Sequence, residues 1–143
     1  MLRIRAMRPE DYPSLVALWR DAGLPSRPEG RDARAHIERE MEGPSSIFLV
    51  AEVDGRMVGA VLGTHDGRKG WINRLAVHPA HRGKGIGKML VEAVEHILEE
   101  KGILISCALV EEWNQDSLEF FEEIGYIRHD DIMYLSKRKG QWV

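Results

Sequence analysis

The sequence feature that most constrains the fold is a long amphipathic pattern that begins at Ile86 and ends at Gly102. Its apolar residues recur at intervals of three and four, the spacing of a helix that packs one face on a sheet. Gly102 can adopt the left-handed conformation that commonly ends a helix. Since such a face needs a cover, the pattern predicts an α/β fold. The apolar positions are Ile86, Met89, Leu90, Ala93, Val94, Ile97 and Leu98.

Apolar runs predict the strands of that sheet. Residues 47–53 and 57–62 are joined through Asp54-Gly55, whose tolerance of positive φ suits a tight hairpin, so they should be antiparallel neighbours. We expect a mixed, mainly antiparallel sheet of about six to seven strands with helices on both faces. The other predicted strands are residues 2–6, 71–77, 103–110, 126–128 and 132–136. Three further helices are predicted: one begins at Pro9, one covers residues 31–42, and one ends at Gly125.

Length and charge limit the classes of function. A chain of 143 residues has the size of one compact domain, so residues 1–143 are predicted to form a single domain. The net charge of -3, with both signs interspersed, gives no basic field that would attract a nucleic acid. No apolar stretch approaches the ~20 residues that span a bilayer, and no secretory signal is evident. We therefore expect a cytoplasmic protein without a nucleic-acid or membrane partner.

The cysteine and histidine content predicts no metal site. Cys107 is the only cysteine, so neither an intrachain disulfide nor a cysteine cluster is expected. The six histidines show no metal-ligand spacing with carboxylates.

A glycine-rich segment precedes the long helix and predicts an anion site. The first N–H groups of a helix lack intrahelical partners and attract phosphate, and glycines let the backbone approach it closely. Lysine and arginine add charge and directed donors. Met89 after Lys88 excludes a P-loop, and Lys88 stands where a dinucleotide fingerprint needs glycine. The segment consists of Arg82, Gly83, Lys84, Gly85, Ile86, Gly87 and Lys88.

This segment resembles the coenzyme-A-binding motif of the GNAT acetyltransferase superfamily, which is Arg or Gln, two variable residues, Gly, one variable residue, and Gly or Ala. Arg82, Gly85 and Gly87 fill that pattern. The strand at residues 71–77 is also similar to the family, as is a downstream set formed by Asn114, Ser117, Phe120, Phe121, Gly125 and Tyr126. The resemblance implies a GNAT-like sheet with splayed central strands and an N-acetyltransferase that uses acetyl-CoA as cosubstrate.

The resemblance also implies the cofactor-binding residues. Backbone groups of Leu75, Ala76 and Val77 would bind the pantetheine arm, and the segment from Arg82 to Lys88 would bind the pyrophosphate. Asn114 matches a position that often contacts the cofactor in the family. Asparagine is also favoured as the N-cap of any helix, so both roles remain open for Asn114.

The catalytic groups of the family are not matched. Many relatives carry a carboxylate on the splayed strand as general base, where this chain has Asn73-Arg74, and a tyrosine as general acid, where it has Phe121. Candidate replacements are Glu111, Glu112 and Tyr134. Solvated glutamates at a strand end and a packed aromatic residue explain the same three positions without catalysis.

Two functions are consistent with this pattern. The first is transfer of an acetyl group to a primary amine by direct attack in a ternary complex, the acceptor being a small molecule, a lysine or a protein N-terminus. The alternative is a non-catalytic acyl-CoA-binding or sensing module, because both usual catalytic groups are absent. Exposed terminal strands would also allow a homodimer to form.

Overall fold

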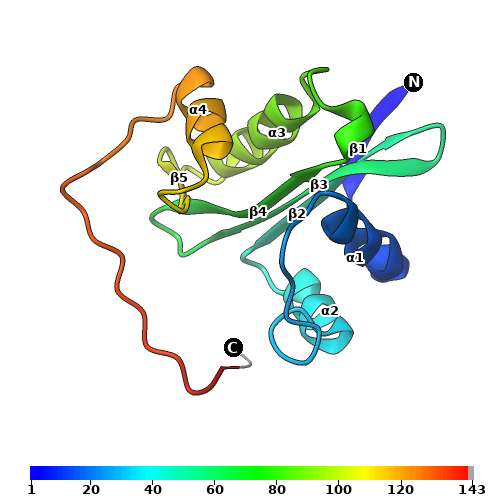
Figure 1. The fold of residues 1–143 in the computed structure, drawn as a ribbon, viewed down its shortest axis with the longest axis horizontal. Coiled ribbons are helices and arrows are strands. Elements are labelled where there is room, and N and C mark those ends of the chain that lie inside the picture. Colours follow the sequence, from blue (N-terminus) through cyan, green and yellow to red (C-terminus); the bar gives the residue numbers. More distant parts are fainter. Residues whose placement is uncertain (142–143) are drawn as a thin grey trace.

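The computed structural model describes residues 1–141 as a five-stranded sheet in the order β1-β2-β3-β4-β5 (Figure 1). The first four strands are antiparallel neighbours, and β5 is parallel to β4. The strands are β1 Leu2–Ala6, β2 Ser46–Val53, β3 Arg56–His65, β4 Gly70–Val77 and β5 Ser106–Ala108. The α-helices are α1 Tyr12–Asp21, α2 Arg34–Glu42, α3 Ile86–Glu100 and α4 Gln115–Glu123, and the 3-10 helices are η1 Pro9–Asp11 and η2 Pro79–His81.

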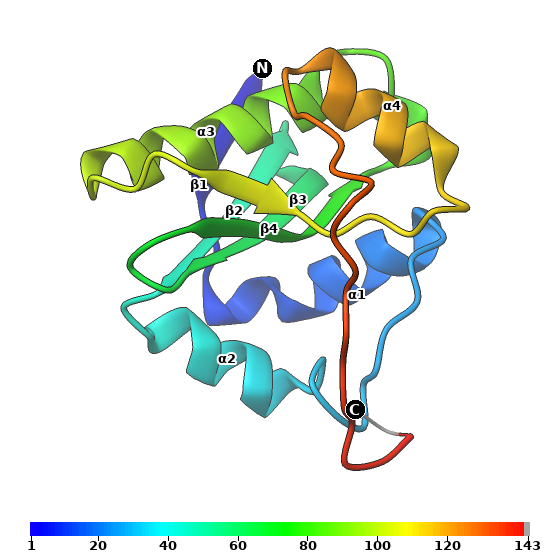
Figure 2. The same ribbon diagram turned by 90° about the vertical axis from the view of Figure 1, so that its left-hand side faces the viewer.

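Helices cover both faces of the sheet, as predicted. Helices α3 and α4 lie on one face, and α1 and α2 lie on the other (Figures 1 and 2). Successive strand residues point to opposite faces, so Leu49 packs in the cluster of α3 while Val50 packs in the cluster of α1 and α2. The long predicted helix is α3, and its apolar stripe of Leu90, Val94 and Leu98 is fully buried.

The predicted hairpin is confirmed between β2 and β3. Asp54 and Gly55 both have positive φ, at 52° and 79°, and Val53 pairs with Arg56 across the turn. This is the pair of left-handed residues that a two-residue hairpin loop requires.

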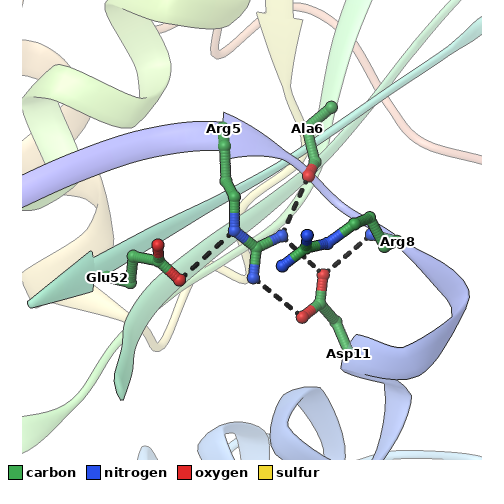
Figure 3. Close-up of polar contacts among 5 residues, drawn as sticks. All are labelled: Arg5, Ala6, Arg8, Asp11 and Glu52. Carbon is green, nitrogen blue, oxygen red and sulfur yellow. Dashed lines mark hydrogen bonds and ion pairs between the residues drawn. The ribbon is translucent and has the colours of Figure 1, made fainter. Parts of the chain in front are cut away.

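A cluster of charged side chains fixes β1 to its neighbours (Figure 3). The Arg5 guanidinium donates to both carboxylate oxygens of Asp11 at 2.8 and 2.9 Å and to Glu52 Oε2 at 3.2 Å. All three side chains are largely buried. The Arg5 hydrogen bonds lower the pKa of Asp11, because they stabilise its charged form. The cluster therefore joins β1, η1 and β2 around one guanidinium.

Strands β4 and β5 part halfway along β4. They pair only from Gly70 with Ser106 to Ile72 with Ala108, whereas β4 continues to Val77. The register of β4 with β3 shifts between Leu62 and Gly63, at the level of Asn73. The predicted splay is thus present, and it opens immediately before the glycine-rich segment.

Two predictions about the strands were wrong. Residues 126–128 and 132–136 form no strand, and β5 is shorter than the predicted 103–110, so the described sheet has five strands rather than six to seven. After residue 126 the chain leaves the body in an extended course (Figure 1). A strand needs a neighbouring strand for its backbone groups, and the sheet formed within residues 1–141 does not extend to this segment.

Candidate active site

The glycine-rich loop between η2 and α3 holds an open backbone conformation. Gly83 and Gly85 both have φ of 79°, a left-handed value that side chains resist, and Gly85 is the N-cap of α3. A Cβ built at either glycine would meet no atom within 4 Å. The loop therefore presents an accessible backbone, free of side chains at Gly83 and Gly85, at the start of the long helix α3.

The first turn of α3 supplies unpaired donors to this loop. The first backbone bond of the helix is donated by Met89 N to Gly85 O at 3.0 Å, so the N–H groups of Ile86, Gly87 and Lys88 have no intrahelical acceptor. The Ile86 side chain is buried in the core and fixes the turn in place. Lys84 and Lys88 are exposed beside it. Three donors, the helix dipole and two cations together suit a phosphate anion.

Arg82 connects the loop to the other face of the sheet. Its Nε donates to Val77 O at 3.3 Å and its Nη2 to Ala22 O at 3.4 Å, at the C-terminal end of α1. The His78 imidazole lies nearby, with Nε2 3.6 Å from Asp21 Oδ2. The Arg82–Ala22 hydrogen bond and the His78–Asp21 contact hold the C-terminal end of α1 close to the residues that follow β4.

Gly87 permits close packing of α4 on α3. An added Cβ would lie 3.2 Å from two ring carbons of Phe120. Phe120 packs edge-to-face on Phe121, which in turn packs edge-to-face on Tyr126. Asn114 caps α4, because its side-chain oxygen accepts from Ser117 N at 3.2 Å. The capping role of Asn114 is therefore present.

The open edge of β4 presents alternate backbone groups. His78 N donates to Val58 O at 2.8 Å, and the register pairs Ala76 with Ala60. Since alternate residues direct their backbone groups to opposite edges, Ala76 faces β3 whereas Leu75 and Val77 face the splay. Of the three predicted residues, Leu75 and Val77 have groups available to a ligand, and Ala76 supports them within the sheet.

The catalytic candidates lie apart from one another. Glu111 and Glu112 are exposed in the loop between β5 and α4, and Tyr134 lies on the extended C-terminal segment with 65% of its surface exposed. Phe121 is buried and has no hydroxyl. The structure thus brings the glycine loop next to Phe120 of α4 and Val77 of β4, and none of the catalytic candidates is part of that group.

Polar contacts that the sequence did not reveal surround the splay. Asn73 Nδ2 donates to Thr64 Oγ1 at 2.7 Å, so the amide that replaces the family carboxylate is held by β3. The Arg74 guanidinium lies 4.2 Å from the centre of the Trp19 ring and 3.7 Å from the buried Asp32 carboxylate. In the sequence, the only indication of these contacts is Asn73-Arg74 at the place where the family often has a carboxylate. Their partners Thr64, Trp19 and Asp32 lie in other segments of the chain.

Residues 1–141 contain neither a candidate membrane span nor a candidate metal site. No helix there is long and apolar enough to cross a membrane. No group of three or more His, Cys, Asp or Glu side chains within this described range could hold a metal ion.

A glycine loop at the N-terminus of a long helix, placed beside the splay of β4 and β5, has the geometry of an anion-binding site. Residues 8–126 match the family model described as the acetyltransferase (GNAT) family. The chain belongs to this family, so the predicted resemblance and the acetyltransferase class are confirmed.

Solved structures share the fold at low sequence identity. PaiA N-acetyltransferase from Thermoplasma acidophilum, in complex with coenzyme A, has a TM-score of 0.82 and 23% identity, over 91% of this chain and 92% of that one. Aminoglycoside N-acetyltransferase AAC(6')-Iy in complex with CoA has a TM-score of 0.83 and 19% identity, over 96% and 95%. Ribosomal-protein-alanine N-acetyltransferase from Brucella melitensis biovar Abortus 2308 has a TM-score of 0.74 and 22% identity, over 96% and 100%.

Proposed function

We propose that this acetyltransferase binds acetyl-CoA and transfers the acetyl group to a primary amine by direct attack in a ternary complex. The observation that carries the proposal is the loop of Gly83 and Gly85 at the N-terminus of α3, which has left-handed glycines, open space and unpaired N–H groups. Two structures with this fold contain coenzyme A, which supports the same ligand.

The residues of the loop would bind the pyrophosphate. The N–H groups of Ile86, Gly87 and Lys88 point out of the first helical turn, and Lys84 and Lys88 neutralise charge. Arg82 donates to the carbonyl groups of Val77 and Ala22, so it would hold the loop in position. Its positive charge would act from beside the pyrophosphate rather than through a direct bond. Asn114 would contact the ligand from the start of α4 while it caps that helix.

The open edge of β4 would hold the pantetheine arm and polarise the thioester. Leu75 and Val77 direct N–H groups into the splay, where a carbonyl oxygen gains charge as the amine attacks its carbon. Donors fixed in a sheet need no reorganisation at that moment, which makes them effective in catalysis. Acetyl-CoA supplies the activated acyl group, and the carbon–sulfur bond breaks as the carbon–nitrogen bond forms.

Proton transfer would rely on water and on residues outside the usual family positions. Asn73 has no basicity and its amide is bound to Thr64, and Phe121 cannot donate a proton. Glu111, Glu112 and Tyr134 remain the candidates for base and acid. Loss of a general acid or base costs about 10²–10⁴-fold in rate, so we expect slow turnover with a clear preference for amines of low pKa.

Calorimetric titration with acetyl-CoA tests the ligand. The Gly85→Glu variant places a carboxylate and a Cβ in the open loop and is expected to abolish binding. Gly55→Glu is the matched control, because Gly55 has the same φ of 79° and equally open space but lies in the β2–β3 hairpin. Equal affinity of the two variants, or no binding by the unmodified chain, would contradict the proposal.

A second experiment separates an enzyme from an acyl-CoA-binding module. Release of free CoA thiol is followed with a panel of small amines, lysine peptides and peptides with free N-termini. Turnover that disappears in the Gly85→Glu variant supports the transferase. Tight binding of acetyl-CoA without turnover by any amine would favour the module, which the absence of a hydroxyl at Phe121 and of a carboxylate at Asn73 makes the second candidate.

A further inference from the structure

The connector between α1 and α2, which we define as residues 22–33, is bonded to both ends of the open half of β4. It lies on the face of the sheet opposite α3 and α4 (Figure 2). Arg74, at the start of the open half, donates from Nη2 to Pro25 O at 2.5 Å. Arg82, which follows β4, donates from Nη2 to Ala22 O at 3.4 Å. The first residues of the connector therefore run beside the part of β4 that would hold the thioester.

Protein side chains fill the α3 side of this open half. Leu75 and Val77 pack against the hydrophobic cluster of α3. A Cβ added at Gly87 would lie 3.2 Å from ring carbons of Phe120 and 3.7 Å from Val77 Cγ2, so α4 also closes that side. The Arg74 side chain instead lies on the connector's side, where it stacks on α1. An acceptor amine would thus reach the thioester from the connector's side of the sheet.

A hollow of about 480 Å³ opens between α1 and the first residues of the connector. This volume lies within the range of small-molecule sites. Among the described residues that line it, Arg20 is the only charged one, and most of the others are apolar or small. The lining consists of Val16, Arg20, Gly23, Leu24, Pro25 and Ser26.

The Arg20 guanidinium is available to an anionic ligand. Its side chain is 75% exposed, and its Nε lies 3.6 Å from the Asp21 carboxylate, which is beyond hydrogen-bond distance. On the other side of Pro25 lies Arg74, whose Nε is buried and has no hydrogen-bond partner within residues 1–141. The Asp32 carboxylate beside Arg74 is itself buried, with 6% of its side chain exposed. The charges nearest to the hollow are therefore mainly positive.

The connector itself adds positive charge. Arg27 and Arg31 are exposed, and Glu29 is the one exposed acid of residues 22–33. Burial lowers the pKa of Arg74, Asp32 opposes this shift, and the charge of Arg31 adds to it, so Arg31 lies close enough to repel Arg74. A second ammonium group on an acceptor would be repelled by these guanidinium groups, whereas a carboxylate would be attracted.

The lining of the hollow matches an aliphatic amine with an acidic end. Val16, Leu24 and Pro25 offer apolar surface to a hydrocarbon chain. A guanidinium such as that of Arg20 can pair with a carboxylate through two parallel N–H···O bonds. The opposite end of such a molecule, its amine, would then extend toward the open half of β4.

Building on the proposed function, we propose that the acceptor is a small primary amine that also carries a carboxylate, and that Arg20 binds this carboxylate in the hollow between α1 and the connector. The amine nitrogen attacks the thioester carbon, and the carbon–nitrogen bond forms as the carbon–sulfur bond breaks. One amine proton passes through water to the sulfur of CoA. The carboxylate is unchanged in the reaction and serves only to hold the acceptor.

A series of linear ω-amino acids of increasing length, each compared with its amide and with the diamine of equal length, tests the substrate class. Their amines have similar pKa values because the differing group is remote. Release of CoA thiol gives kcat/KM at alkaline pH. At the best length, the amino acid should exceed the amide and the diamine by about 10-fold, the lower end expected of a charged hydrogen bond. The preference should shrink as salt is added. Equal rates, or a faster diamine at every length, would overturn the proposal.

Arg20→Gln should bring the rate of the amino acid down to that of the amide, mainly through a higher KM. Arg20→Lys keeps the charge and should retain part of the preference. Arg3→Gln is the matched control, because it removes one exposed cation on β1, at the opposite edge of the sheet from β5, and should keep the full preference. A preference that persists in Arg20→Gln would overturn the assignment of this residue. Circular dichroism checks that the variants are folded.

Calorimetric titration with the N-acetylated amino acid and with its amide measures the carboxylate site without turnover. The acid should bind more tightly than the amide, and Arg20→Gln should remove the difference. If no amine is turned over but this difference is found, the transferase is wrong and the carboxylate site stands. If amines are turned over but acid and amide bind equally, the transferase stands and the carboxylate site is refuted.

Discussion

The glycines of this molecule have two different structural roles: some adopt a left-handed backbone conformation, and others allow close packing. Gly83 and Gly85 supply left-handed backbone conformations in the glycine-rich loop before α3, with open space around them. Gly87 and Gly70 have ordinary φ and serve close packing, Gly87 against Phe120 and Gly70 against Leu98. The two groups should therefore respond differently to the addition of one methyl group.

Gly70→Ala should destabilise the fold. The new Cβ would lie 2.2 Å from Leu98 Cδ1, and Leu98 is fully buried, so its side chain has little room to move. We expect the free energy of unfolding in urea to fall by about 1–3 kcal/mol, the usual cost of overpacking. In the Gly70→Ala, Leu98→Ala double variant the loss should be smaller than the sum of the single losses. Additive losses would show that the clash relaxes elsewhere.

The sequence predicted the glycine-rich loop and its place at the start of α3, but not the contacts of this loop across the fold. Helix-start glycines and lysines form a local pattern, so Gly83, Gly85 and Lys88 could be recognised directly. The bonds of Arg82 to Ala22 O and of Asn73 to Thr64 join segments 60 and 9 residues apart. Such contacts depend on the register and the packing of the sheet, which no local pattern contains.

At the scale of the element, the Arg5 cluster makes the attachment of β1 dependent on pH. The pKa of Asp11 is lowered from its usual 3.8, chiefly by the Arg5 hydrogen bond, so its contribution to stability is present above that value and is lost as pH falls through the lowered folded pKa. Asp11→Asn should lower the free energy of unfolding at pH 7 by about 1.5–3 kcal/mol, the value of charged hydrogen bonds.

Chemical denaturation at several pH values checks this prediction. The difference between the unmodified chain and Asp11→Asn should be constant from pH 5 to 7 and should shrink progressively below about 3.9. A difference that persists at the lowest pH would mean that packing rather than charge holds β1. Glu10→Gln is the control, because Glu10 is exposed beside Asp11.

The two roles of Asn114 can be separated through its element, α4. Asn114→Ala removes the bond from Ser117 N and should lower the free energy of unfolding by about 1 kcal/mol, the usual value of an N-cap. Asn114→Asp keeps the cap but loses the amide donor. If Asn114 also contacts acetyl-CoA, calorimetry will show weaker binding by Asn114→Asp at unchanged stability. Unchanged affinity would leave Asn114 as a cap alone.

Elements with strong periodicity were predicted well, and those that depend on a distant partner were not. The apolar stripe of α3 and the Asp54-Gly55 turn can each be recognised from a short stretch of sequence alone. The apolar run at residues 132–136 is compatible with a strand, but a neighbouring strand decides whether one forms. Within residues 1–141 the sheet does not pair with this segment, so the prediction of two terminal strands was wrong.

At the scale of the whole molecule, Arg74 ties the connection between α1 and α2 to the sheet. Its Nη2 donates to Pro25 O at 2.5 Å, and its guanidinium lies near Asp32 and over Trp19. Burial lowers the pKa of Arg74, whereas Asp32 opposes that shift. One side chain of β4 thus organises the layer formed by α1, α2 and the residues between them.

Arg74→Met should destabilise this layer by about 3–5 kcal/mol, because the buried Asp32 carboxylate loses its cation. Adding Asp32→Asn should restore part of the loss, since the remaining group is then neutral. Thermal unfolding followed by Trp fluorescence measures both, as Trp19 lies under the guanidinium. Failure of the second substitution to restore stability would assign the effect to lost stacking instead.

The parting of β4 and β5 leaves the sheet one strand short along residues 73–77. If a pantetheine arm occupies that place, the cosubstrate is an interchangeable strand that joins the sheet at the start of each turnover and leaves at its end. No protein strand need then move for loading or release. Amide hydrogens of Leu75 and Val77 should exchange with solvent rapidly in the free protein and slowly with CoA bound, while that of Ala76, which faces β3, should be slow in both.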